Sequence, residues 1–274
     1  MIESVDDDTW AGIAHQFADE AYASVKGMVR TYVLDRQLRE HLPPPPASVL
    51  DVGGGAGHQS FLLAQAGYEV TLLDSSPAML AKAGQRLQNL PEPARQRVRL
   101  IRADAEHAVD AVDGRRFDAV LCHGVLGYLA HPEPVVEQLC RCADSAGIVS
   151  IMTGNAHAMA VRPALEQRWD DALAAFDTDT EVGVLGLPTR ADTVEGLGGI
   201  LVDHGVQPLT WYGVWLFTDW LEFGGVALDA ADTTRVKATA VVEFEAGRRD
   251  PYRGLSRVFH LLGRKEPALT GRSA

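Results

Sequence analysis

One glycine-rich segment restricts, more than any other feature, what this chain can fold into. It reads Leu50-Asp51-Val52-Gly53-Gly54-Gly55-Ala56-Gly57 and follows a short apolar run that begins at Ala47. Closely spaced glycines allow positive φ angles and let a ligand approach the backbone. Because a helical pattern begins directly afterwards at His58, the segment is expected to connect a strand to a helix N-terminus, an arrangement that often binds nucleotides.

The spacing of these glycines excludes two common nucleotide-binding motifs. A dinucleotide fingerprint has the spacing Gly-x-Gly-x-x-Gly, but counting from Gly53 places His58 at the sixth position. The Gly-x-x-x-x-Gly-Lys-Ser/Thr sequence of P-loop nucleotidases is also absent. Any bound nucleotide is therefore expected to be of another kind.

The first 155 residues alternate between strand-like and helix-like patterns. Strands are expected at residues 47–52, 69–73, 98–102, 117–122 and 148–153, and helices at 58–66, 76–90 and 135–142. Such alternation predicts a mainly parallel sheet with helices on both faces. Two later strands, at 206–217 and 257–262, are expected to close the sheet as an antiparallel pair. The predicted fold is therefore α/β and Rossmann-like, with a seven-stranded, mostly parallel sheet.

We expect a single domain over residues 1–274, with additions around a core at 47–155. Apolar residues at three-to-four spacing predict a helical N-terminal cap over 1–42; they include Trp10, Ile13, Ala14, Phe17 and Ala21. Four prolines at 43–46 end this cap. The region 156–196 is expected to be a helical lid, and 197–274 the C-terminal part of the sheet.

Composition and charge exclude several classes of protein. The chain is 46% hydrophobic and 23% charged, as in globular proteins with a full core. It has no apolar run of about 20 residues, as a membrane span requires, and its acidic N-terminus does not resemble a signal peptide, so we expect a cytoplasmic protein. The three cysteines predict neither disulfide nor zinc site, and no metal is expected. A formal net charge of −12 disfavours nonspecific nucleic-acid binding but permits a local basic patch.

Four polar side chains are expected at one edge of the sheet. Asp51, Asp74, Asp104 and His123 each lie at or near the carboxyl end of a predicted strand. Right-handed crossovers bring these ends to the same edge, where ligands of such sheets bind. Asp74 lies 23 residues after Asp51, and a carboxylate there can accept hydrogen bonds from both hydroxyls of a ribose.

The pattern Asp-x-Gly-x-Gly-x-Gly resembles motif I of the class I S-adenosylmethionine-dependent methyltransferases. The resemblance implies that Asp51 and the backbone of Gly53, Gly54 and Gly55 hold the amino-acid half of this cofactor. It further implies contacts to the ribose and adenine from the segments at the next two strand ends, which are Asp74, Ser75, Asp104 and Ala105.

A narrower resemblance extends over nearly the whole chain. The residues that carry it include Ile13-Ala14-x-x-Phe17, Tyr22, Lys26-Gly27-x-x-Arg30, His123-Gly124-Val125-Leu126, His131-Pro132, Asn155-Ala156-His157, Phe217-x-Asp219, Asp250-Pro251-Tyr252 and Ser256-Arg257. These motifs resemble the bacterial tRNA 5-carboxymethoxyuridine methyltransferases, which methylate a carboxylate on the wobble uridine. The resemblance implies that Arg30 pairs with the cofactor carboxylate and that His123 lies near the transferred methyl. The chain departs from that family at Ala56 and lacks a lysine-rich stretch between Asp177 and Thr189.

The methyl acceptor is less constrained by the sequence. A carboxylate acceptor is already ionised and needs no base, whereas for a hydroxyl or amine His123 would be the leading catalytic base. The candidates for substrate contacts are Tyr128, Asn155, His157, Arg190, Arg249, Tyr252 and Arg253.

Three functions remain open. The first is a tRNA carboxyl methyltransferase, which predicts a basic strip near the cofactor; the second is a small-molecule methyltransferase, which predicts a closed and mostly apolar acceptor pocket. The third is a protein that binds S-adenosylmethionine without turnover, which predicts an occluded acceptor pocket. The sequence indicates no oligomeric state.

Overall fold

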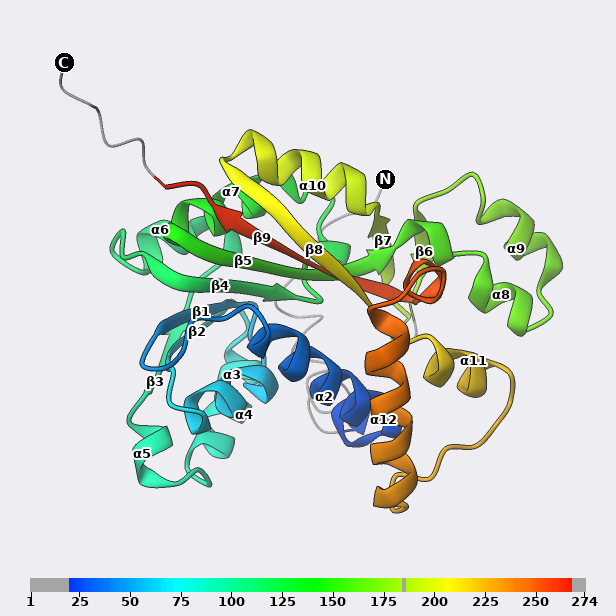
Figure 1. Cartoon of the computed structure of the whole chain (residues 1–274), viewed down its shortest axis with the longest axis horizontal. Helices are drawn as coiled ribbons and strands as arrows, with labels where there is room; N and C mark the ends of the chain where they lie inside the picture. The colour runs from blue at the N-terminus through cyan, green and yellow to red at the C-terminus, as the bar shows by residue number, and fades with distance from the viewer. Residues whose placement is uncertain (1–19, 184–185, 268–274) are drawn as a thin grey trace.

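The structure is a computed structural model that describes residues 20–183 and 186–267 (Figure 1). The predicted N-terminal cap therefore lies partly outside the described residues, together with Trp10, Ile13, Ala14 and Phe17. Its described part is helix α2 (Val25–Arg39), where Ser24 accepts a hydrogen bond from the Gly27 amide and so caps the first turn. No helix in the described ranges has the length and hydropathy needed to cross a bilayer.

Among the described residues the sheet has nine strands, two more than predicted, and it contains all seven predicted ones. They are β1 (Ser48–Val52), β2 (Glu69–Asp74), β3 (Val98–Arg102), β4 (Phe117–His123), β5 (Ala143–Asn155), β8 (Val206–Val214) and β9 (Val258–Lys265). The first five pair in parallel in the order β3-β2-β1-β4-β5. β9 pairs antiparallel with both β5 and β8. This topology confirms the predicted α/β Rossmann-like fold and its antiparallel C-terminal pair.

Helices cover both faces of this sheet (Figure 1). One face carries α6 (Ala108–Ala111), α7 (Glu133–Cys142) and α10 (Val194–Asp203), and the other carries α2, α3 (His58–Gln65), α4 (Pro77–Leu87) and α12 (Thr233–Gly247). The shorter helical segments are α5 (Glu92–Arg95), α11 (Phe217–Phe223), η2 (Ala105–His107), η3 (Leu126–Tyr128) and η5 (Tyr252–Leu255). Because both faces are covered, the central strands are buried and mostly apolar, as Leu50, Val120 and Leu121 illustrate.

The region expected as a helical lid is only partly helical. It begins with η4 (Ala156–Ala158), α8 (Val161–Leu165) and α9 (Trp169–Ala174). A hairpin of β6 (Thr180–Val182) and β7 (Pro188–Asp192) follows, and β7 pairs in parallel with the end of β5. The expectation of helix throughout 156–196 was wrong because this short, polar hairpin takes its stability from pairing with β5, which local periodicity does not reveal.

The glycine turn joins β1 to α3 as expected. Gly53, Gly55 and Gly57 have φ angles of +67°, +55° and +79°, values that side chains with a Cβ rarely adopt. The Gly53 amide donates to the carbonyl of Leu73 at 2.7 Å, so the turn is tied to the end of β2. The backbone is thereby fixed at the carboxyl edge of the sheet.

Candidate active site

Two cavities adjoin at the carboxyl edge of the parallel strands. The glycine-turn cavity, of about 310 Å³, is lined by the turn and the ends of β2, β3 and β4. The hairpin cavity, of about 460 Å³, is lined by the start of α2, the end of β5 and the β6–β7 hairpin. Tyr22, Gly124 and Tyr128 line both cavities, so ligands in the two would meet at these residues.

The glycine-turn cavity contains most of the predicted cofactor residues. Its lining includes Gly53, Gly54, Gly55, Asp74, Ser75, Asp104, Ala105 and His123. A Cβ atom added at Gly55 would meet no neighbouring atom within 4 Å, so the backbone here faces open space. A ligand can therefore approach the turn closely, as the sequence predicted.

Asp74 is oriented by two backbone amides. Its Oδ2 accepts a hydrogen bond from the Gly55 amide at 2.8 Å, and its Oδ1 accepts one from the Ser76 amide at 2.9 Å. The same Ser76 caps α4 by accepting from the Met79 amide. The carboxylate thus joins the glycine turn to the start of α4 and is held at the cavity wall.

Asp51 lies behind the turn and does not line the cavity. Its side chain is buried, and Oδ2 accepts a hydrogen bond from the Ser60 hydroxyl at 2.6 Å. Burial raises the pKa of Asp51 to about 6, although the Ser60 hydrogen bond and the charge of Arg30 oppose the shift. Any influence of Asp51 on a ligand would therefore pass through the turn that it supports.

Arg30 lines the hairpin cavity, next to the residues that both cavities share. Its Nη1 donates to the Tyr22 hydroxyl at 2.7 Å, and its Nη2 lies 3.5 Å from the His123 carbonyl. The Tyr22 ring stacks on the His58 ring with 3.6 Å between centroids. Arg30 is therefore buried at the boundary between the cavities, where its charge would attract an anionic group in either.

His123 ends β4 and is bonded inward. Its Nε2 lies 2.8 Å from the Ser150 hydroxyl, while its Nδ1 is buried and has no hydrogen-bond partner among the described residues. Burial lowers the pKa of His123 well below its usual value, and the charge of Arg30 adds to that effect. The imidazole is therefore neutral at physiological pH.

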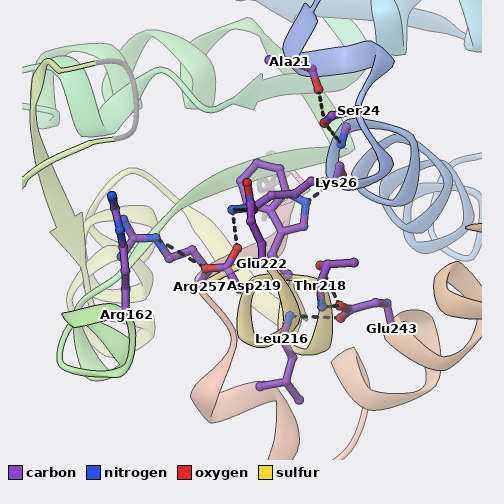
Figure 2. A network of polar contacts seen from close by, with 12 residues as sticks. Ala21, Ser24, Lys26, Arg162, Leu216, Thr218, Asp219, Glu222, Glu243 and Arg257 are labelled. Carbon is purple, nitrogen blue, oxygen red and sulfur yellow. Dashed lines mark hydrogen bonds and ion pairs between the residues drawn. The ribbon is translucent and has the colours of Figure 1, made fainter. Parts of the chain in front are cut away.

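The hairpin cavity is largely apolar in its lining but holds four cationic side chains, which are Lys26, Arg30, Arg190 and Arg257. Figure 2 shows how two of them are held by buried Asp219 on α11. Lys26 Nζ lies 2.5 Å from Asp219 Oδ1 and 3.0 Å from Glu222 Oε2. Arg257 Nε lies 3.9 Å from Asp219 Oδ2, and Arg257 also pairs with Glu181 of the hairpin. These two cations are thus largely neutralised.

Arg190 on β7 differs from these cations. Its Nη1 donates to Asp192 Oδ1 at 2.6 Å, and the Thr153 hydroxyl donates to the other Asp192 oxygen at 2.9 Å. Its Nε and Nη2 are buried and have no hydrogen-bond partner among the described residues. These two nitrogens form one edge of the guanidinium, which is the edge that binds a carboxylate with two parallel hydrogen bonds.

The other predicted substrate residues are placed less favourably. Tyr128 and Asn155 line the hairpin cavity, but Asn155 donates to the Gly254 and Ser256 carbonyls and accepts from the His157 amide. Its polar atoms are thus occupied by structural bonds. His157, Arg249, Tyr252 and Arg253 do not line either cavity.

The two C-terminal arginines are paired with acids instead. Arg249 lies 2.7 Å from Glu245, and Arg253 bonds Asp250 and covers the Trp211 ring at 4.1 Å. Both arginines of this segment are therefore ion-paired. Both acids lie three or four positions before their arginine, a spacing that the sequence already shows.

Sequence reasoning missed Trp215 and Asp192 as residues of this region. Trp215 lines the hairpin cavity with a φ of +63°, an uncommon value for a bulky residue, and its Nε1 donates to the Lys26 carbonyl at 2.9 Å. Neither residue belongs to a recognisable motif, so no local signal would have identified them.

Comparisons with known proteins agree with this geometry. Residues 50–151 match the profile of a methyltransferase domain family. The chain is a class I S-adenosylmethionine-dependent methyltransferase. Its cofactor is S-adenosylmethionine. This methyltransferase is 27% identical over 259 residues to the tRNA 5-carboxymethoxyuridine methyltransferases of two Escherichia coli strains, O157:H7 and K12, covering 92% of this chain and 94% of theirs.

Solved structures share the fold at lower identity. The magnesium protoporphyrin IX methyltransferase of Synechocystis PCC 6803, which has S-adenosylhomocysteine bound, matches with a TM-score of 0.62 and 15% identity, covering 95% of this chain and 98% of that one. The CcbJ methyltransferase of Streptomyces caelestis matches with a TM-score of 0.60 and 15% identity, covering 96% of this chain and 100% of that one. These likenesses concern the fold alone.

Proposed function

We propose that this methyltransferase esterifies a carboxylate that binds in the hairpin cavity against Arg190. The observation that carries the proposal is the guanidinium edge of Arg190, whose Nε and Nη2 have no partner among the described residues. Buried donors without a partner are costly and rare. A carboxylate would satisfy both nitrogens at once. Neither nitrogen has accessible surface in this structure, so the proposal requires the side chains around Arg190 to move apart when the acceptor enters the hairpin cavity.

We assign the glycine-turn cavity to the cofactor. Asp74 would accept the ribose hydroxyls, the backbone at Gly53 to Gly55 would approach the amino-acid half, and Asp104 with Ala105 would contact the adenine. Ser75 would lie beside the ribose, and Arg30 at the boundary would pair with the cofactor carboxylate. The size of the cavity, the open space above Gly55 and the two-point orientation of Asp74 fit such a ligand.

For methyl transfer to a carboxylate, the protein mainly has to align the two reactants and exclude water. The bound cofactor supplies an electrophilic methyl group on a positively charged sulfur. A carboxylate is ionised at neutral pH, so its attack requires no base. The protein's part is to hold the acceptor in line at the residues shared by the cavities, Tyr22, Gly124 and Tyr128, and to keep the pocket dry.

The first candidate acceptor is the carboxymethoxy group of a modified wobble uridine in tRNA. It is supported by the two Escherichia coli relatives of that name, whose similarity spans nearly the whole of both chains. A flipped nucleotide would have to enter the hairpin cavity far enough to reach Arg190.

A small carboxylic acid is the second candidate, and two observations favour it. Arg249 and Arg253 are each paired with an acid, which reduces the net positive charge that this segment offers to phosphates. The lining of the hairpin cavity is mostly apolar, as expected for a small-molecule pocket. A protein without turnover was expected to have an occluded acceptor pocket, whereas the hairpin cavity has about 460 Å³.

The test is a methyl-transfer assay with methyl-labelled cofactor and two acceptor pools. One pool is total tRNA from cells that make carboxymethoxyuridine but lack its methyltransferase; the other is a small-metabolite extract. The tRNA candidate predicts label on wobble nucleosides, and label confined to the metabolite pool would contradict it. Label in either pool should fall sharply with Arg190→Gln, and unchanged transfer would contradict the role of Arg190.

A further inference from the structure

A buried chain of hydrogen bonds runs from α2 through the sheet to His123. Gln37 Oε1 lies 2.8 Å from His260 Nδ1, and His260 Nε2 lies 2.7 Å from the Ser150 hydroxyl. The same hydroxyl lies 2.8 Å from His123 Nε2. Gln37, Ser150 and His260 have no exposed surface, so water does not supply alternative partners to these side chains.

The donor and acceptor roles along this series of hydrogen bonds follow from the Gly213 carbonyl together with the neutral state of His260. Gln37 Nε2 lies 3.3 Å from the Gly213 carbonyl oxygen, which can only accept. The amide nitrogen of Gln37 must therefore face Gly213, which leaves its oxygen to accept from His260 Nδ1. His260 is neutral because burial lowers its pKa to about 3, so its Nε2 is an acceptor and the Ser150 hydroxyl donates to it. The Ser150 oxygen then accepts from His123 Nε2.

We infer that Gln37, His260 and Ser150 are positioning residues that fix His123 as the Nε2–H tautomer. The hydrogen bond made by one ring nitrogen sets the state of the other, so Nδ1 of His123 is left unprotonated. This agrees with the lack of any hydrogen-bond partner for Nδ1 among the described residues. The relay links α2, β9, β5 and β4, four elements that are distant in sequence and meet only in the folded sheet.

The fixed tautomer defines what His123 can do beside the glycine-turn cavity. An unprotonated Nδ1 cannot donate a hydrogen bond to a carboxylate, and in this structure its lone pair is buried. His123 therefore does not compete with Arg190 for an anionic acceptor. Its neutral ring suits the neighbourhood of Arg30 and of a cationic cofactor, whichever acceptor the methyltransferase uses.

The experiment reads the tautomers directly by nitrogen-15 NMR of the histidine rings in the full-length protein without cofactor or acceptor. Signals of His123 are assigned by their loss in His123→Gln, and those of His260 by their loss in His260→Gln. The inference predicts opposite tautomers, Nε2–H for His123 and Nδ1–H for His260. Detection of His123 as the Nδ1–H form, or as a mixture, would overturn it even if the proposed acceptor is correct.

Two matched substitutions test the relay. Ser150→Ala should convert His123 to a mixture of tautomers, while cofactor affinity changes less than about twofold. Ser256→Ala removes another buried hydroxyl, one without a hydrogen-bond partner among the described residues, and should not change the tautomer. An unchanged His123 tautomer in Ser150→Ala, or the same change in both variants, would refute the relay.

A second variant covers the case in which Ser150→Ala does not fold. Gln37→Glu keeps an oxygen opposite His260 but adds a charge that favours protonation of both His260 nitrogens. His260 would then donate to the Ser150 oxygen, and the hydroxyl hydrogen would turn toward His123 Nε2, giving the Nδ1–H tautomer of His123. An introduced carboxyl that stays protonated would donate to the Gly213 carbonyl as the glutamine does and keep the wild-type tautomer, so its carbon-13 shift is recorded in the same sample. An ionised carboxyl together with an unchanged His123 tautomer would overturn the inference.

Discussion

Replacing Asp74 with asparagine should weaken cofactor binding by on the order of a hundredfold. Both carboxylate oxygens accept backbone amide hydrogens, from Gly55 and Ser76. Asparagine offers only one acceptor oxygen, so its amino group would have to face one of these donors. Each hydrogen bond to a charged group contributes about 1.5 to 3 kcal/mol. If the misplaced side chain no longer accepts the hydrogen bonds of the ribose hydroxyls, the binding free energy of the cofactor falls by about 3 kcal/mol. This loss corresponds to about a hundredfold increase in Kd.

The measurement is isothermal titration with S-adenosylhomocysteine, which binds without turnover. Asp118→Asn is the matched control, because Asp118 accepts from both the amide and the hydroxyl of Ser48 at the opposite end of β1. The control should lose comparable stability in urea while its Kd remains within about twofold of the wild type. A Kd for Asp74→Asn within about threefold of wild type would refute the assignment of the ribose to Asp74.

Three further outcomes are expected. Arg190→Lys keeps the charge but loses the two-nitrogen edge, so steady-state kinetics should show KM for the acceptor rising about tenfold. The control Arg249→Lys changes an arginine outside both cavities and should leave KM as in the wild type. Equal KM values in the two variants would contradict the placing of the acceptor at Arg190. Leu121→Ala, fully buried in β4, should lower the unfolding free energy in urea by about 2 to 5 kcal/mol, and a loss below about 1 kcal/mol would show that the site repacks. Because burial raises the pKa of Asp51 from 3.8 to about 6, the folded protein holds that proton more tightly than the unfolded chain does, and this stabilisation is lost as pH rises from about 4 to about 6. Urea titrations of wild type and Asp51→Asn should therefore differ by an amount that changes by on the order of 3 kcal/mol over that interval, and a constant difference would argue against the raised pKa.

The parallel core of the fold was predictable because its signals are local. The strand Val98–Arg102 matches its predicted bounds, and α4 begins at Pro77, one residue after the predicted start, with Ser76 as its cap. The strand predicted to end at Phe217 stops at Val214, because Trp215 adopts a positive φ angle and α11 follows. Periodicity cannot report such a turn at a bulky residue.

Other elements depend on contacts that the linear sequence hides. Helix α12 was not predicted: it is rich in β-branched residues, which favour strands, and packs on α2. Its one local signal is Asp232, whose side chain accepts from the Arg235 amide. The hairpin that carries Arg190 likewise depends on β5.

The residues of the candidate site also fall into two groups, those that the sequence could predict and those that depend on three-dimensional contacts. Strand-end residues such as Asp74 and His123 were predictable because the topology brings parallel strand ends to one edge. The burial of Asp51 behind the turn and the unpaired edge of Arg190 are three-dimensional properties. So is the relay through Gln37 and His260, because its members come from opposite ends of the chain.

Transfer of the methyl group to a carboxylate is the central claim, and the product itself can test it. Methyl esters release methanol in mild alkali, whereas methyl ethers and N-methyl groups do not. After reaction with methyl-labelled cofactor, brief alkaline treatment of the product should therefore release nearly all of the label as volatile methanol. Label that stays bound to the product through this treatment would contradict a carboxylate acceptor and with it the proposed role of Arg190.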